Sequence, residues 1–208
     1  MIAIVDYGVG NLRSVEKAIA RTGAEVGVTS ESAAILEADA VVLPGVGAFG
    51  ACMRNLEEYG LTDTVKRAAR SGKPFLGICV GMQILFEESE EFGPIAGLGL
   101  FPGRVRKFAG PALAGLKIPQ MGWNRLSVRK GVPELEGIDD GAFVYFVHSY
   151  YVEPTDPALA AATTDYGVSF AAAIARDNVF ACQFHPEKSQ AVGLKILENF
   201  AARAEART

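Results

Sequence analysis

The 208-residue chain has few of the residues that build disulfide-linked or metal-bound scaffolds. It contains three cysteines, two histidines and one tryptophan. The cysteines are odd in number and lack the spacing of a metal site, which argues against a disulfide framework and against a structural metal. Free cysteines are typical of a reducing compartment, so we expect a cytoplasmic protein. We also expect no metal and no other cofactor.

The sequence also lacks an excess of positive charge. Its 20 Lys and Arg stand against 24 Asp and Glu, for a net charge of −4, which gives no electrostatic attraction to nucleic acid or to an anionic membrane. Uncharged stretches of membrane-spanning length without Gly or Pro are missing. The chain enters an apolar run at Ile2 with no basic leader before it. We therefore expect a soluble enzyme with neither a nucleic-acid nor a membrane partner.

The chain does contain an ordered alternation of strand and helix patterns. Half of its residues are hydrophobic, and the length suits one α/β domain over residues 1–208. Alternation up to residue 87 predicts a mostly parallel sheet with helices on both faces, a three-layer αβα arrangement, and the C-terminal half adds short antiparallel strands. Strands are expected at 2–6, 25–29, 40–43, 75–78, 104–108, 124–128, 142–146, 159–163, 169–175 and 180–184. Helices are expected at 11–22 (closed by Gly23), 52–59, 61–71 and from a Ser189 cap to 202.

One stretch, residues 74–85, carries the clearest chemical signal. An apolar strand over 75–78 leads into Cys79, after which apolar residues recur at helical spacing. Gly77 and Gly81 flank the cysteine two residues on either side, where a sharp turn from strand to helix would crowd a Cβ atom. This pattern is typical of a nucleophile elbow, here with cysteine in place of serine. The same residues also fit a small buried cysteine between two packing glycines.

A second segment, His185-Pro186-Glu187, supplies what a cysteine nucleophile needs. A free thiol is mostly protonated at neutral pH and requires a base or a cationic neighbour. In an extended segment His185 and Glu187 point the same way, so the carboxylate can orient the imidazole in a triad. His148 is the competing base, but no acidic residue lies near it in sequence, and we expect it to be structural. Cys52 and Cys182 lie in apolar patterns and are expected in the core.

Together the two motifs resemble those of the class I glutamine amidotransferases. The resemblance rests on Gly-Ile-Cys-x-Gly-x-Gln after a strand and on Phe-His-Pro-Glu near the C-terminus. It implies a flavodoxin-like fold and L-glutamine hydrolysis by Cys79, His185 and Glu187. By the residues alone, the loop from Pro44 is an ordinary tight turn; by resemblance it forms an oxyanion hole. The implied oxyanion-hole residues are Val46, Gly47 and Val80, and the implied substrate-binding residues are Gly47, Gln83, Ser149 and Tyr150.

Three further stretches resemble one branch of that family, the glutaminase subunits of imidazole glycerol phosphate synthases. They are residues 118–124, 146–151 and 185–189, and the opening Asp-Tyr-Gly-x-Gly-Asn is similar too. Val9 departs from the pattern, since many relatives carry proline there. The resemblance implies a heterodimer of histidine biosynthesis in which a separate cyclase subunit is the partner. The residues that match the family's interface or ammonia exit are Tyr7, Asn11, Trp123, Tyr145 and Lys188.

Two alternatives remain open at this point. The chain could be the glutaminase subunit of a pyridoxal phosphate, anthranilate or guanylate pathway, against which the Pro-Gln-Met-Gly-Trp-Asn stretch argues. It could also be a catalytically silent docking or regulatory protein on the same fold, against which the complete set of Cys79, His185 and Glu187 argues.

Overall fold

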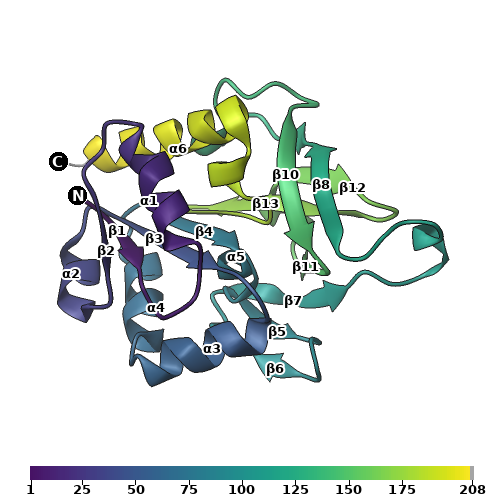
Figure 1. The fold of residues 1–208 in the computed structure, drawn as a ribbon, viewed down its shortest axis with the longest axis horizontal. Helices are drawn as coiled ribbons and strands as arrows, with labels where there is room; N and C mark the ends of the chain where they lie inside the picture. Colours follow the sequence, from purple (N-terminus) through teal and green to yellow (C-terminus); the bar gives the residue numbers. More distant parts are fainter. Residues whose placement is uncertain (207–208) are drawn as a thin grey trace.

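A central sheet of eight strands organises the protein in a computed structural model that describes residues 1–206 (Figure 1). The strand order is β2-β1-β3-β4-β14-β13-β12-β9. The five strands from β2 to β14 are parallel to their neighbours, and the last three pairings are antiparallel. The bounds are β1 Ile2–Val5, β2 Val26–Thr29, β3 Ala40–Gly45, β4 Phe75–Cys79, β9 Ser127–Val128, β12 Ala160–Asp165, β13 Ser169–Arg176 and β14 Val179–Cys182.

Helices cover both faces of this sheet. On one face α1 (Leu12–Ala20) packs against α6 (Gln190–Glu205), and on the other α4 (Thr62–Arg70) contacts both α2 (Ser32–Glu37) and α3 (Phe49–Glu58) (Figure 1). The arrangement confirms the expected three-layer α/β fold with a mostly parallel sheet and additional antiparallel strands in the C-terminal half.

Two smaller sheets contact the antiparallel part of the central sheet, one at β12 and the other at β13 (Figure 1). One is the antiparallel pair β8 (Gln120–Arg125) and β10 (Phe143–His148). The other has the order β11-β7-β5-β6, with β5 Phe86–Ser89, β6 Ile95–Ala96, β7 Phe101–Lys107 and β11 Tyr150–Pro154. Single turns complete the path: α5 Val80–Gln83, η1 Pro111–Leu113, η2 Pro133–Leu135, η3 Pro157–Leu159 and η4 Pro186–Lys188.

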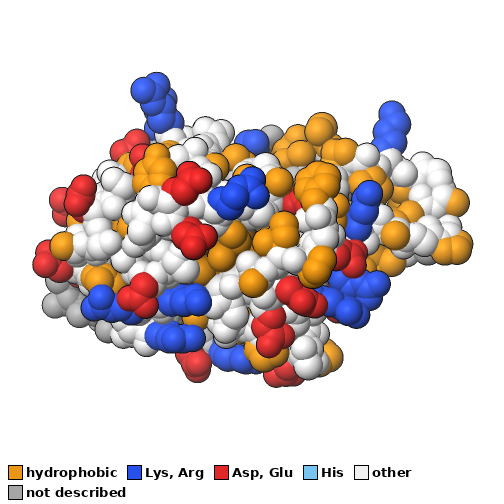
Figure 2. Space-filling view, turned by 90° about the horizontal axis from the view of Figure 1, so that it is seen from below, with side chains coloured by type: hydrophobic (Ala, Val, Ile, Leu, Met, Phe, Trp, Pro, Cys, Tyr) orange, Lys and Arg blue, Asp and Glu red, His pale blue; other side chains and the backbone are white. Residues whose placement is uncertain are grey.

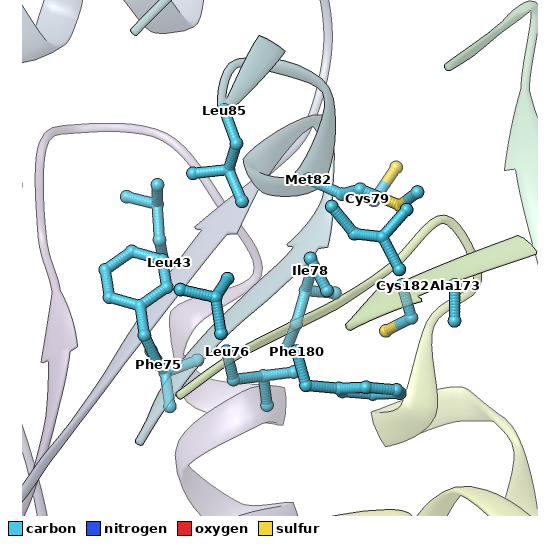
Figure 3. Close-up of a cluster of buried hydrophobic side chains, with 14 of the residues drawn as sticks. Leu43, Phe75, Leu76, Ile78, Cys79, Met82, Leu85, Ala173, Phe180 and Cys182 are labelled. Atoms are coloured by element: carbon cyan, nitrogen blue, oxygen red, sulfur yellow. The ribbon is translucent and has the colours of Figure 1, made fainter. Parts of the chain in front are cut away.

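The core is centred on β4, whose five residues are all buried between β3 and β14. Figure 3 shows Leu76 and Ile78 of this strand together with Leu43 of β3 and Phe180 of β14 in the buried cluster next to Cys79. On the face seen in Figure 2, acidic and basic side chains are interspersed, in keeping with the small net charge. Within residues 1–206, no helix is both long and apolar enough to cross a membrane.

Several predicted elements are wrong in detail. Helix α2 and strands β5, β6 and β11 were not predicted, and the strand expected at 124–128 is divided between β8 and β9. Gly23 has a φ of 91° but lies two residues beyond the actual C-cap, Arg21. Ser189 precedes α6 without capping it: its hydroxyl donates to the His185 carbonyl oxygen at 2.7 Å and accepts the Tyr145 N–H at 3.0 Å.

Candidate active site

Cys79 ends β4 in a strained backbone conformation. Its φ of 55° lies in the left-handed region, which costs a non-glycine residue on the order of 1–3 kcal/mol. The turn packs so closely on β3 that a Cβ atom on Gly81 would lie 2.0 Å from the Leu43 carbonyl oxygen. A Cβ on Gly77 would lie 3.0 Å from the Gly81 carbonyl oxygen. The sharp turn predicted from the two glycines is therefore present.

The helix expected after Cys79 is much shorter than its apolar spacing suggested. α5 is a single turn, and the chain re-enters a strand at Phe86. One turn carries only a small part of a helix macrodipole. Any stabilisation of a Cys79 thiolate must therefore come mainly from side chains around the sulfur.

The topology of the sheet brings His185 to Cys79. β14 is parallel to β4, with Cys182 opposite Ile78, so the chain that leaves β14 passes beside the end of β4. His185 Nδ1 lies 2.8 Å from Glu187 Oε1, and both side chains are almost completely buried. Glu187 stands on the 3-10 turn η4, so the expectation of an extended His-Pro-Glu segment is wrong, although the contact forms.

The surroundings of His185 favour its protonated form. Burial alone would lower the pKa of the imidazole, but hydrogen bonds to Cys79 and Glu187 outweigh this effect and raise the pKa to about 9. An imidazolium beside a cysteine sulfur favours the thiolate, which is the reactive form. The three side chains therefore have the arrangement of a nucleophile, a base and an orienting carboxylate.

Two of these residues, Cys79 and His185, line a pocket of about 380 Å³. It collects Cys79 and His185 together with every residue that was expected to form the oxyanion hole or bind substrate. Its lining consists of Val46, Gly47, Cys79, Val80, Gln83, Glu91, Pro119, Val147, His148, Ser149, Tyr150, His185 and Lys188. Its volume suits a small polar molecule rather than a polymer.

The loop after β3 presents backbone to this pocket. Gly47 has a φ of 84°, which glycine adopts without strain. The Val46 carbonyl accepts a weak hydrogen bond from the Cys52 thiol at 3.5 Å, and the Tyr7 hydroxyl donates to the Pro44 carbonyl at 2.6 Å. Because the N–H of a trans peptide points opposite to its C=O, the Gly47 N–H is directed away from Cys52.

Gln83 is held from two sides. Its Nε2 atom donates to the Tyr150 carbonyl at 3.0 Å and to Gln183 Oε1 at 2.9 Å. Both amide hydrogens are thus engaged with the protein, so the Gln83 oxygen is the atom left to contact a ligand.

His148 is buried beside the pocket and makes contacts of its own. Its Nδ1 lies 2.8 Å from the Tyr150 carbonyl oxygen and its Nε2 lies 3.0 Å from Gln120 Oε1. Burial lowers its pKa to about 4, which keeps the ring neutral. Cys52 and Cys182 are also buried, as expected for core residues, and burial raises the pKa of both thiols.

The residues expected at a partner interface divide into two groups. Trp123 is 45% exposed, and its ring centroid lies 6.0 Å from that of Tyr145, over which the Lys188 Nζ lies at 5.9 Å. Asn11 is exposed as well. Tyr7, in contrast, is completely buried under the loop after β3. A completely buried side chain does not contact a partner, so of the two roles that the resemblance implies for Tyr7, only a place at the ammonia exit stays a prediction.

Sequence reasoning missed Glu91, Pro119 and Val147 in the pocket lining and Gln183 behind it. Glu91 lies in a turn with no motif to mark it, whereas Pro119 and Val147 lie in the stretches 118–124 and 146–151, which marked the family but gave no role to these two residues. Gln183 had a usable signal, because the strand expected at 180–184 and the extended segment expected from His185 would place these two residues, two apart, on the same side. Within the described residues no group of His, Cys, Asp and Glu could hold a metal ion.

Comparisons with known proteins agree with this geometry. The family profile described as Glutamine amidotransferase class-I matches residues 3–204. Imidazole glycerol phosphate synthase subunit HisH of Geobacter sulfurreducens is 55% identical over 96% of this chain and 97% of its own, and that of Aquifex aeolicus is 52% identical over 97% and 96%. A chain in the structure of PurLQS from Thermotoga maritima has the same fold, with a TM-score of 0.72, 20% identity, and coverage of 99% of this chain and 97% of that one. The chain belongs to the class-I glutamine amidotransferase family.

Proposed function

We propose that this protein is the glutaminase subunit of an imidazole glycerol phosphate synthase. The observation that carries the proposal is its identity of 55% over 96% of the chain to a relative of that name. The pocket supports the chemistry, because it places Cys79 and His185 beside the Gly47 loop. We also propose that residues 1–208 act as one amidotransferase domain in the cytoplasm, where the three free cysteines stay reduced.

The chain's residues account for each step of glutamine hydrolysis. The Cys79 thiolate attacks the side-chain amide carbon of L-glutamine, and N–H groups of Gly47 and Val80 stabilise the oxyanion. Protonated His185 gives its proton to the leaving nitrogen, so that ammonia departs and a γ-glutamyl thioester remains on Cys79. His185 then takes a proton from water, whose oxygen attacks the thioester and releases glutamate and the thiolate.

Binding of glutamine falls to the remaining pocket residues. The Gln83 oxygen can accept from the substrate's ammonium group, while backbone groups of Ser149 and Tyr150 also contact the substrate. Glu187 keeps the His185 ring oriented and stabilises its positive charge. Val46 shapes the oxyanion loop, and Lys188 also lines the pocket.

The ammonia is consumed by a separate cyclase subunit, which forms imidazole glycerol phosphate and AICAR. Free ammonia is largely protonated at neutral pH and then no longer nucleophilic, so its transfer requires a shielded route. Side chains on the outer face of β8 and β10 offer a docking surface: Met121, Trp123 and Phe143 are 66%, 45% and 46% exposed. We call these three residues, with Tyr145 and Lys188, the β8–β10 patch; aromatic side chains and methionine are enriched in protein interfaces.

Rescue by ammonia tests this division of labour. A complex of the cyclase with the Cys79→Ala variant should make no product from glutamine, yet should make it from ammonium salt at alkaline pH. Glutaminase activity of the wild-type chain should rise when the cyclase and its ligand are added. If ammonium does not rescue the variant complex, while the cyclase alone is competent with ammonium, the proposal is wrong.

A further inference from the structure

Gln183 is a buried polar side chain that the mechanism above does not use. It follows the last residue of β14 and is completely inaccessible to solvent. Its backbone N–H is engaged with the Ala172 carbonyl at 2.8 Å. The side-chain amide lies between Gln83 on one side and the Cys79 sulfur, 3.6 Å from Nε2, on the other.

The neighbours of this amide determine which of its ends faces the sulfur. A backbone carbonyl can only accept, so the Gln83 atom at the Tyr150 carbonyl must be the amino group. That same nitrogen is 2.9 Å from the Gln183 amide and therefore requires an acceptor, Oε1, there. The Gln183 amino group is consequently the end that faces Cys79.

We propose that Gln183 is a further catalytic residue, whose amide N–H donates to the Cys79 sulfur and stabilises it as the thiolate. The proposal rests on the proposed function of Cys79 as nucleophile and adds a second donor to the imidazolium of His185. The same hydrogen bond stabilises the sulfur when the thioester breaks down and Cys79 leaves with the electron pair. The helix after Cys79, α5, is a single turn. The hydrogen bond from Gln183 therefore supplies thiolate stabilisation that the macrodipole of a longer helix would otherwise give.

The contacts also connect the sulfur to the substrate side of the pocket. A chain of hydrogen bonds runs from the Tyr150 carbonyl through Gln83 and Gln183 to Cys79. Gln83 thus has two tasks: its oxygen faces the pocket, and its amino group fixes the amide that donates to the sulfur.

The test measures the thiolate directly, without glutamine turnover. We would follow alkylation of Cys79 by iodoacetamide from pH 5 to 10, reading the modified peptide by mass spectrometry, in the wild type and in Gln183→Met and Gln183→Leu. Hydrogen bonds to charged groups are strong enough that losing this one should move the midpoint of the profile upward by about one pH unit. At pH values well below both midpoints, where the thiolate is the minor form, the alkylation rate should then fall about tenfold.

Cys182→Ala is the matched control, because it changes the buried residue next to Gln183 without touching the amide. Its alkylation profile should equal that of the wild type. Thermal unfolding identifies which Gln183 variant is folded, and Met, being unbranched and flexible, is the better replacement for packing. A folded Gln183 variant with an unchanged midpoint would overturn the proposal. Failure of wild-type Cys79 to react with the glutamine analogue diazo-oxo-norleucine would instead overturn the proposed function.

Discussion

The two carboxylate oxygens of Glu187 differ in their hydrogen bonding. Oε1 lies 2.8 Å from His185 Nδ1, whereas Oε2 is buried with no hydrogen-bond partner among the described residues. A buried carboxylate with an unsatisfied oxygen is costly. Its one hydrogen bond, to the imidazolium of His185, is therefore the contact that offsets the cost of burying this carboxylate.

We expect Glu187→Gln to lower kcat for glutamine hydrolysis at least about tenfold, and by less than removal of His185 does. The amide retains the size of the side chain and an acceptor but loses the charge that stabilises the imidazolium. Steady-state kinetics across pH would measure the effect. Glu198→Gln makes the same change on the exposed face of α6 and should leave kcat unchanged. Equal kcat values and pH profiles for Glu187→Gln and wild type would contradict the role.

The buried His148 makes stability depend on pH in the acidic range. Its pKa is about 4 in the folded protein, against an ordinary value of 6.5, so between these values the unfolded chain binds a proton that the folded chain does not. Stability that is complete above pH 6.5 should fall toward pH 4 by up to about 1.4 kcal/mol per pH unit. Urea unfolding of wild type and His148→Gln at pH 7, 5.5 and 4.5 would test this, the variant losing less. Parallel losses in the two proteins would exclude His148 as the cause.

At the scale of residues, the sequence predicted what depends on chemical type and missed what depends on packing. Cys79, His185 and Glu187 lie close together as predicted, because each stands in a short motif whose side-chain types mark a candidate nucleophile, base or carboxylate. The burial of Tyr7 was not predicted, because nothing local to an aromatic residue says that its hydroxyl will reach Pro44, 37 positions away, in the interior.

Among the elements, the elbow between β4 and α5 is the most tightly constrained. A Cβ atom on Gly81 would meet the Leu43 carbonyl oxygen and carbon at 2.0 and 3.0 Å, and these are backbone atoms of a central strand. Side-chain rotation cannot relieve such a contact. An added methyl group must therefore push β3 and the elbow apart.

We expect Gly81→Ala to destabilise the protein by more than about 3 kcal/mol, in the range that marks serious steric conflict. Gly27→Ala in β2 is the matched control: its Cβ would meet only the Met1 sulfur at an ordinary 3.5 Å. Urea unfolding of both variants would measure the difference. A Gly81→Ala protein as stable as Gly27→Ala would show that the elbow yields more easily than its geometry implies.

Elements with a clear periodic pattern were predicted well, and short ones were not. β1, β3, β4 and α4 have buried faces that their sequences display directly. β6 has two residues, and β5 continues an apolar spacing that reads equally well as helix. These two strands form because they pair within the sheet β11-β7-β5-β6. That pairing depends on tertiary contacts, which no local sequence pattern identifies.

At the scale of the whole molecule, the candidate pocket and the β8–β10 patch are joined through Lys188. This residue lines the pocket, and its ammonium group also lies over the Tyr145 ring. The turn that carries it is hydrogen-bonded to β10, since the His185 N–H donates to the Tyr145 carbonyl at 2.9 Å. A cyclase bound on the patch would therefore contact the segment that bears the base.

We expect Lys188→Ala to separate hydrolysis from synthesis. The triad side chains remain, but a contact between pocket and patch is lost. The cyclase should stimulate hydrolysis less, or glutamate should form faster than imidazole glycerol phosphate, measured in the same assay. Lys195→Ala removes an exposed lysine from α6 and should behave as wild type. A one-to-one product ratio and full stimulation in Lys188→Ala would contradict the assignment.

The position of β14 in the sheet has a consequence for how the protein is made. In the sheet β4 lies between β3 and β14. β4 ends at residue 79, whereas β14 consists of residues 179–182 and is therefore synthesised about 100 residues later. During translation one edge of β4 therefore has no paired strand until β14 is synthesised. Unpaired strand edges can form hydrogen bonds with strands of other chains. Nascent or C-terminally truncated chains should thus depend on chaperones and aggregate readily. His185 is synthesised directly after β14, so a nascent chain that ends before this segment lacks the histidine and cannot hydrolyse glutamine.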